Sequence, residues 1–202
     1  MENQDKKKII IIEAALKRFA HYGLSKTTMS EIAKDISLSK ALLYYYFPDK
    51  ISLYVSTMEY LMQKISRETV KSIDKASTST EAVLKLLQKR QSYIQKYYNL
   101  FESSLTIGSD LPDDLYDKFS KAKAFEKIII NSLLTRGVAN KELAMDDPKL
   151  TTEIFIDAIS GIHFNILAKD KSIFPGKDQF KEIFYKEKIF ADIFLAGLAV
   201  RP

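Results

Sequence analysis

The chain has 202 residues, of which 46% are hydrophobic and 28% are charged, and its formal net charge is +5. This composition is typical of one long or two short globular domains, and the lack of cysteine excludes disulfides and thiolate chemistry. No apolar run approaches the roughly eighteen residues of a membrane span, and segment 9–12 is too short for a signal-peptide core, so we expect a cytoplasmic protein without membrane contact.

The first fifty residues are predicted to form three short helices. Ile11, Ala15 and Phe19 recur at the spacing of a buried helix face, and Gly23 supplies a stop after Tyr22. Three such helices share a core that is marginal alone, so this module is expected to lean on the following domain. The same segment holds nine Lys and Arg against six Asp and Glu, a net +3, which suits contact with phosphate.

Segment 27–50 is the most informative part of the sequence. Thr28 and Glu31 form a capping-box pattern, which predicts the start of the second helix. Ser39 is a favoured N-cap for the third helix, and Asp49 can cap a fourth. Two short helices joined by a tight turn are therefore expected here.

The third helix is predicted to bury one face. Leu43 and Phe47, four residues apart, share that face, and Tyr44 is expected in the core beside them. Tyr45 and Tyr46 lie outside it, where their hydroxyl groups can reach DNA phosphates.

Together these residues resemble the DNA-binding domain of TetR-family transcriptional regulators. Two positions depart from the family pattern. Ser37 replaces a usual glycine, so either Ser37 adopts a positive φ or the turn differs, and Ala41 and Leu42 stand where a small residue and a threonine are usual. The resemblance covers about the first fifty-five residues and rests on Ile11, Ala15, Phe19, Gly23, Thr27, Thr28, Ile32, Ala33, Leu43, Tyr44, Phe47 and Lys50.

The resemblance implies an all-α fold with two domains. Residues 1–48 would form a helix-turn-helix DNA-binding domain, and residues 49–202 a larger helical domain for effector binding and dimerisation. The helix starting near Ser39 would enter the major groove, with Lys40 reaching a guanine edge. The residues expected to contact DNA are Lys26, Thr27, Thr28, Ser39, Lys40, Ala41, Leu42, Tyr45, Tyr46 and Lys50.

Three of these assignments have open alternatives. Leu42 either contacts a thymine methyl group or packs between helices. Thr28 either serves only as a cap or also takes a phosphate. Lys50 is either a phosphate contact or a solvated surface lysine.

The rest of the sequence is predicted to be entirely helical. Apolar residues recur at helical spacing, and no alternating strand pattern is present. Gly137 is expected to end one helix, and Asp147 can cap the next at Pro148. The expected helices cover about 49–75, 81–105, 115–136, 148–168 and 177–199.

The last two predicted helices are unusually apolar. Segments 154–167 and 189–200 have apolar residues most of the way round, and such a helix must be buried on all sides. We therefore expect a C2 homodimer through the helices at 148–168 and 177–199, and the family resemblance points the same way. The alternative is that these helices form the core of their own domain.

The resemblance also implies a small-molecule effector in the second domain. We expect an apolar or aromatic molecule that shifts the helix beginning at Lys50 and so releases a repressor from a palindromic operator in double-stranded DNA. Each candidate side chain has the alternative of plain core packing. The candidates are Tyr60, Met62, Tyr93, Tyr97, Phe101, Phe119, Phe125, His163 and Phe164.

Little in the sequence suggests an enzyme. There is no glycine-rich phosphate loop, and His21 and His163 lack metal-ligand spacing. Aspartates at 110–117 and 146–147 could bind a hard cation, but solvated charges near helix N-termini explain them more simply. We expect no catalytic residue, metal or cofactor. A helical interaction module without DNA binding is the remaining alternative.

Overall fold

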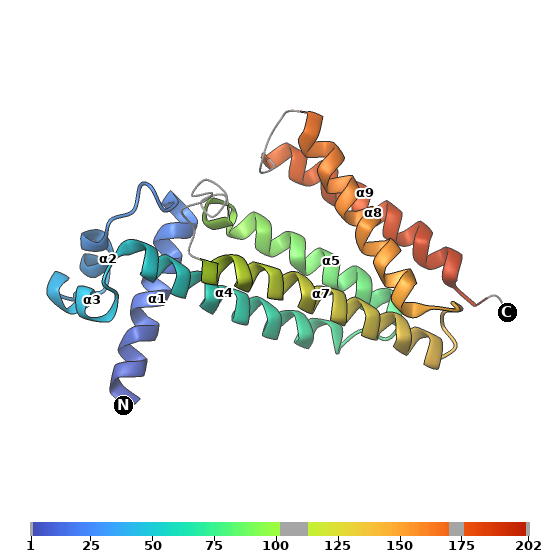
Figure 1. Ribbon diagram of the computed structural model, residues 1–202, viewed down its shortest axis with the longest axis horizontal. Coiled ribbons are helices and arrows are strands. Elements are labelled where there is room, and N and C mark those ends of the chain that lie inside the picture. Colours follow the sequence, from blue (N-terminus) through green and yellow to red (C-terminus); the bar gives the residue numbers. More distant parts are fainter. Residues whose placement is uncertain (1, 102–112, 170–175, 201–202) are drawn as a thin grey trace. The chain divides into compact units, whose positions relative to one another are not determined.

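The computed structural model describes residues 2–101, 113–169 and 176–200, and this part of the chain is helical as expected (Figure 1). An isolated β-bridge between Leu143 and Ala199 is the one extended pairing among these residues. No helix in the described ranges has the length and hydropathy to cross a membrane. The helices are α1 (Glu2–Tyr22), α2 (Met29–Asp35), α3 (Lys40–Tyr46), α4 (Lys50–Ile73), α5 (Ser79–Lys96), α7 (Asp113–Ala139), α8 (Pro148–Lys169) and α9 (Lys177–Leu198).

The chain divides into two compact units. The N-terminal unit comprises Met1–Ser66 and Lys96–Lys118, and the C-terminal unit comprises Arg67–Gln95 and Phe119–Pro202. The division therefore falls within α4 and not before it. The predicted boundary at residue 48 separates the expected DNA-binding domain from the expected effector-binding domain, and it stays a prediction.

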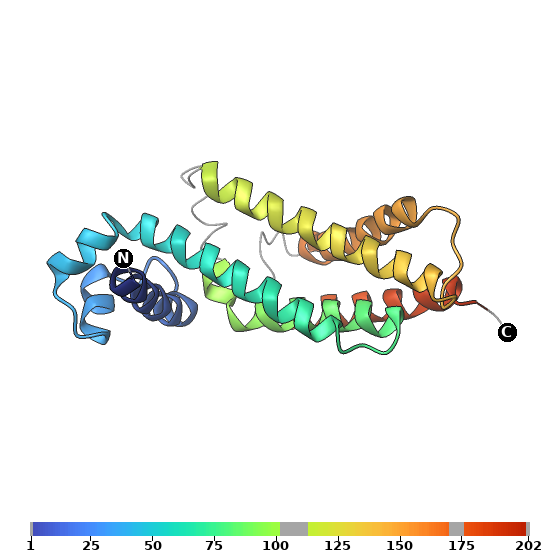
Figure 2. The same cartoon turned by 90° about the horizontal axis from the view of Figure 1, so that it is seen from below.

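The N-terminal unit is built around the first half of α4. Figures 1 and 2 show α1, α2 and α3 gathered at the N-terminal end of that helix. Phe19 of α1 is fully buried and makes an edge-on contact with Tyr54 of α4, with ring centroids 5.5 Å apart. The Tyr54 hydroxyl donates to the carbonyl of Leu100 over 2.6 Å. The expected dependence of the three small helices on the following helix is therefore visible in their shared core.

The core of the C-terminal unit joins α5, α7, α8 and α9. Phe155 of α8 is 1% exposed and lies 5.7 Å from Phe190 and 5.3 Å from Phe194 of α9, measured between ring centroids. Leu87 of α5 and Leu134 of α7 belong to the same buried cluster. These contacts account for one face of each of the two apolar helices α8 and α9.

The predicted helix ends agree with the structure at several caps and differ at two places. Gly23 ends α1 with φ 78°, and the Asp147 carboxylate accepts from two amides of the first turn of α8, as expected. However, α5 ends at Lys96, and residues 98–101 are helical again after a turn at Tyr97, so the expected helix 81–105 is interrupted. Its expected end lies outside the described residues. The prediction that Gly137 ends α7 is also wrong, because the helix continues to Ala139.

Close packing explains the glycine at position 137. A Cβ atom there would meet the Leu143 side chain at 2.6 Å. The Gly137 carbonyl also accepts from the amides of Glu142 and Leu143, at 2.8 and 3.1 Å. Gly137 therefore permits the chain after α7 to fold back against the helix, and the reversal itself uses Lys141 at φ 59°.

Candidate nucleic-acid interface

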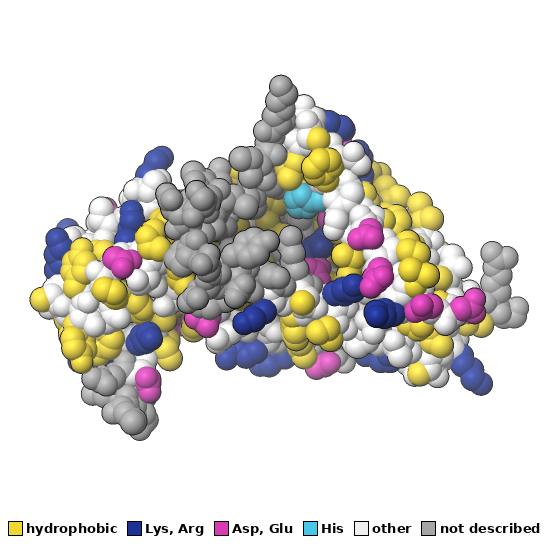
Figure 3. All heavy atoms as spheres, viewed as in Figure 1, with side chains coloured by type: hydrophobic (Ala, Val, Ile, Leu, Met, Phe, Trp, Pro, Cys, Tyr) yellow, Lys and Arg dark blue, Asp and Glu magenta, His cyan; other side chains and the backbone are white. Residues whose placement is uncertain are grey.

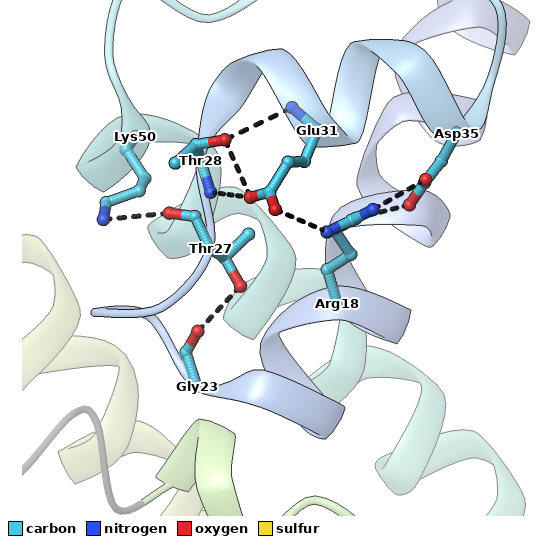
Figure 4. Close-up of polar contacts among 7 residues, drawn as sticks. All are labelled: Arg18, Gly23, Thr27, Thr28, Glu31, Asp35 and Lys50. Atoms are coloured by element: carbon cyan, nitrogen blue, oxygen red, sulfur yellow. Dashed lines mark hydrogen bonds and ion pairs between the residues drawn. The ribbon is translucent and has the colours of Figure 1, made fainter.

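A capping box fixes the start of α2, as the sequence predicted (Figure 4). The Thr28 hydroxyl oxygen accepts from the Glu31 amide at 3.3 Å, and the Glu31 carboxylate accepts from the Thr28 amide at 2.9 Å. The same carboxylate also takes the Thr28 hydroxyl proton at 2.7 Å. Two otherwise unpaired amides at the helix end are thereby satisfied.

Arg18 of α1 holds α2 along its length. Its guanidinium group donates to both oxygens of Asp35, at 2.5 and 2.8 Å, and lies 3.3 Å from the Glu31 carboxylate. The hydrogen bond from Arg18 lowers the pKa of Asp35, and the hydrogen bonds from Thr28 lower the pKa of Glu31. Both carboxylates are therefore ionised at neutral pH, and α2 is fixed against α1.

The turn between α2 and α3 is a Schellman arrangement with serine in the left-handed position. Ser37 has φ 54°, which resolves the alternative left open by the missing glycine. The Leu38 amide donates to the Ala33 carbonyl at 2.9 Å and the Ser37 amide donates to the Lys34 carbonyl at 3.2 Å. The turn therefore keeps its usual hydrogen bonds and places the strain on one residue.

Ser39 caps α3 as predicted, and the buried face of α3 is also confirmed. The Ser39 hydroxyl accepts from the Leu42 amide at 3.2 Å. Leu43 and Phe47 are 0% and 3% exposed. The capped helix is thus held by one face against the rest of the unit.

The opposite side of α3 is open to solvent. We call this surface the α3 face; it consists of Lys40, Ala41, Tyr44 and Tyr45, all of which are exposed. The ammonium of Lys40 lies 5.9 Å from the Tyr44 ring centroid, a cation–π contact. The prediction that Tyr44 belongs to the core is therefore wrong. The sequence contained the signal, since Tyr44 follows Lys40 by four residues and must share its face.

Thr27 and Lys50 build the connection between α1 and α2. Thr27 is fully buried, and its hydroxyl donates to the Gly23 carbonyl at 2.8 Å. The Lys50 ammonium donates to the carbonyls of Leu24 and Thr27, at 2.8 and 3.0 Å (Figure 4). The expectation of a DNA contact by the Thr27 side chain is corrected, because that hydroxyl is buried and already bonded. Lys50 is half-buried, so the alternative of a solvated surface lysine is also corrected.

The remaining predicted DNA contacts differ in exposure. Lys26 and Thr28 are exposed, whereas Leu42 and Tyr46 are half-buried. The Tyr46 ring makes an edge-on contact with the Tyr45 ring at a centroid distance of 5.4 Å. The accessible members of the predicted set are therefore Lys26, Thr28, Ser39, Lys40, Ala41 and Tyr45.

The nine effector candidates do not line one described cavity. A groove of about 340 Å³ lies between α5 and α9, and its lining contains none of them. Tyr97 is buried, the Tyr60 hydroxyl donates to Glu13 at 2.7 Å, and the Tyr93 hydroxyl donates to Glu68. The groove is lined by Glu81, Leu84, Lys85, Leu87, Gln88, Phe184 and Lys188.

Two effector candidates lie on the surface of the chain. Phe125 and Phe164 are 40% and 72% exposed, so within one chain they do not line an enclosed pocket. Met62, Phe101 and His163 are half-buried. The side chain of Phe119 lies outside the described residues.

A charged cluster inside the C-terminal unit was missed by the sequence reasoning. Arg90 of α5 contacts Glu126 of α7 at 3.0 Å and Glu187 of α9 at 2.7 Å. Burial raises the pKa of Glu187, although the Arg90 charge opposes that shift. Glu187 interrupts an apolar stripe on α9, which is the signal that could have found it. No group of three or more metal-ligating side chains occurs in the described part of the chain.

Comparisons with known proteins agree with this geometry. A family model described as "Bacterial regulatory proteins, tetR family" matches residues 11–57. The HTH-type transcriptional regulator YuxN of Bacillus subtilis is 33% identical over 103 residues, which are 51% of this chain and 35% of YuxN. The match thus spans about a third of that relative. The HTH-type transcriptional regulator RutR of Escherichia coli is 26% identical over 186 residues, covering 91% of this chain and 85% of RutR.

A solved structure extends the similarity to both units. The crystal structure of a transcriptional regulator from Cytophaga hutchinsonii superposes with a TM-score of 0.84 at 29% identity, covering 96% of this chain and 99% of that one. Residues 11–57 therefore carry the helix-turn-helix of the TetR family, a family of transcriptional regulators and not of enzymes.

Proposed function

We propose that the chain is a repressor that binds a palindromic DNA operator as a homodimer and leaves it when a small apolar or aromatic effector binds. The observation that carries this proposal is the α3 face, an exposed surface on a helix whose cap, turn and buried side are all fixed. A rigid helix with one open side suits the major groove, which admits an α-helix.

The α3 face divides into base-reading and backbone-contacting residues. Lys40, in the first turn, is the candidate for a guanine edge, and Ala41 allows close approach to the groove. Tyr44 and Tyr45 have exposed hydroxyl-bearing rings that can reach phosphates. Lys26 and Thr28 add phosphate contacts near the start of α2. We add Tyr44 to the proposed DNA contacts because its side chain is exposed, and we remove Thr27 because its side chain is buried.

Dimerisation follows from the apolar surface of α8 and α9. Figure 3 shows part of this surface. A Cβ atom added at Gly161 or Gly197 would meet no atom of the described residues within 4 Å beyond its chain neighbours and its own helix backbone, so a second helix can approach closely there. Exposed apolar side chains of this number on two neighbouring helices are typical of an interface. They are Leu150, Ile154, Phe164, Tyr185, Ile189 and Ile193, with exposed fractions from 41% to 72%. We therefore assign Phe164 to the proposed dimer interface and no longer to the effector site.

Two copies are needed because one short helix contacts too few base pairs. Two α3 helices about one DNA turn apart, roughly 34–36 Å, would read two half-sites related by symmetry. An effector that changes this spacing weakens operator binding, and a coupling of about 1–3 kcal/mol corresponds to a change of roughly 5- to 150-fold.

Selection of bound sequences from random double-stranded DNA tests the proposal. We expect an enriched palindrome with half-sites separated by about one helical turn, bound with an affinity that falls steeply as salt rises. Absence of any enriched sequence would contradict it and favour an interaction module without DNA binding. Analytical ultracentrifugation of Ile193→Asp, with Tyr22→Asp as a control at an exposed position outside α9, tests the dimer separately.

A further inference from the structure

The cluster of Arg90, Glu126 and Glu187 joins three helices of the C-terminal unit. Arg90 Nη2 lies 2.7 Å from Glu187 Oε2, and Arg90 Nη1 lies 3.0 Å from Glu126 Oε1. Gln91, the next residue of α5, donates its side-chain amide to the Phe180 carbonyl of α9 at 3.1 Å. This second contact between α5 and α9 helps to fix the position of the cluster.

Glu187 occupies a position that the fold would otherwise give to an apolar residue. The inward stripe of α9 runs through Phe180, Ile183, Glu187, Ala191 and Leu195, at spacings of three and four residues, and each is at most 2% exposed. A carboxylate buried among such neighbours loses its hydration, and one arginine contact rarely restores all of it. Well-packed apolar residues would stabilise this site as well or better. Stability alone therefore does not account for the charges at this position.

One carboxylate oxygen of this cluster lacks a partner. Within the described residues, Oε1 of Glu187 is buried and accepts no hydrogen bond, whereas Oε2 is bound by Arg90. Two carboxylates and one guanidinium leave a net charge of −1. An additional cationic donor would satisfy the open oxygen and neutralise the cluster in one contact.

The cluster is accessible from one side. The side chains of Arg90 and Glu126 are 26% and 31% exposed, although that of Glu187 is only 2% exposed. A small molecule can therefore approach the charged end of the site without unfolding the unit.

We propose that this cluster is the polar end of the effector site and that Glu187 Oε1 binds a small organic cation through an N–H donor. The inference rests on the proposed function and narrows its ligand class to amines whose remaining body is apolar or aromatic. The open oxygen selects the ammonium group, and the apolar or aromatic body follows from the proposed function.

Calorimetric titration of the full-length protein with three primary amines tests the proposal. The probes are hexylamine, phenethylamine and putrescine, each compared with the alcohol of the same skeleton, and with hexanoate as an anionic control. We expect at least one amine to bind at least tenfold more tightly than its alcohol. The Glu187→Gln variant keeps the side-chain volume and is expected to weaken that amine at least tenfold.

Two further variants keep the result interpretable. Glu182→Gln removes an exposed carboxylate of the same helix, which is paired with Lys186 at 2.7 Å, and should leave amine binding unchanged. The double variant Arg90→Met with Glu187→Leu replaces the buried charges by apolar volume. It should fold, as judged by circular dichroism, and lose the preference for the amine over the alcohol.

The outcomes separate this inference from the proposed function. Equal amine binding by the wild-type protein and Glu187→Gln overturns the inference, as does the absence of binding by all three amines. Binding of hexanoate or an alcohol in place of the amines overturns the cationic specificity and leaves an effector site intact. Operator binding, measured without any probe, decides the DNA-binding function independently.

Discussion

Selected polar side chains of the two units differ in whether their hydrogen-bonding groups have partners. In the N-terminal unit, Arg18 and Lys50 each donate to two or more partners, and those contacts hold α1, α2 and α4 together. In the C-terminal unit, the buried Glu187 keeps one oxygen without a partner in the described structure. Satisfied polar contacts give the α3 face a single geometry, whereas the oxygen without a partner is the position that we propose for a ligand.

The largest effect is expected from separating the charges in the C-terminal unit. Arg90→Met leaves Glu187 buried without its cation and should reduce the free energy of unfolding by about 3–5 kcal/mol. Adding Glu187→Leu should recover most of that loss. Urea denaturation of both variants measures the difference. If the double variant were less stable than Arg90→Met, the charges would be essential to the fold, and the contrast between the units would fail.

A smaller loss is expected from the corresponding change in the N-terminal unit. Lys50→Met removes two charge-assisted hydrogen bonds to the carbonyls of Leu24 and Thr27, each worth about 1.5–3 kcal/mol at most. We expect a net loss of about 2 kcal/mol, because water can replace part of each contact. Lys26→Met, at an exposed position of the same unit, is the control in urea denaturation. Equal stability of the two variants would show that the lysine contacts contribute nothing.

The cap of α3 should contribute about 1 kcal/mol. Ser39→Ala removes the acceptor for the Leu42 amide, whereas Ser39→Gly should cost only a few tenths of a kcal/mol. Thermal unfolding of both variants provides the comparison. A glycine variant as unstable as the alanine variant would indicate that the serine does not act as a cap.

The smallest effect is the pH dependence of the Arg18 contacts in the N-terminal unit. Glu31 and Asp35 have folded pKa values below their ordinary values of 4.5 and 3.8. Their contribution to stability is therefore complete above those values and is lost as the pH falls through the lower, folded values. The stability difference between wild-type protein and Arg18→Met should narrow between about pH 5 and pH 2. A difference that does not change with pH would contradict this assignment.

The sequence predicted local contacts better than distant ones. The capping box of Thr28 and Glu31 and the Ser39 cap involve residues three positions apart, so the pattern contains both partners. The hydrogen bonds of Lys50 join it to carbonyl groups 23 and 26 residues earlier in the chain. Arg90 and Glu187 are 97 positions apart along the chain. Such pairs depend on how helices pack, which spacing alone does not specify.

Two errors have the same physical origin. Tyr44 was expected in the core with Leu43 and Phe47, yet it directly follows Leu43, and neighbouring residues on a helix point about 100° apart. Gly137 was taken as a helix stop, although its role is to admit the Leu143 side chain at close range. In both cases the residue type suggested one role, and the packing partner determined another.

The central claim is that Lys40 on the α3 face reads a base. The most direct test is to measure the affinity of Lys40→Ala for the selected operator and for every single-base-pair variant of it. We expect the preference at one symmetric pair of positions to disappear, at a cost of about 1–3 kcal/mol, while all other preferences persist. Lys26→Ala should weaken binding to all sequences alike. A uniform loss for Lys40→Ala, indistinguishable from that of Lys26→Ala, would contradict the claim.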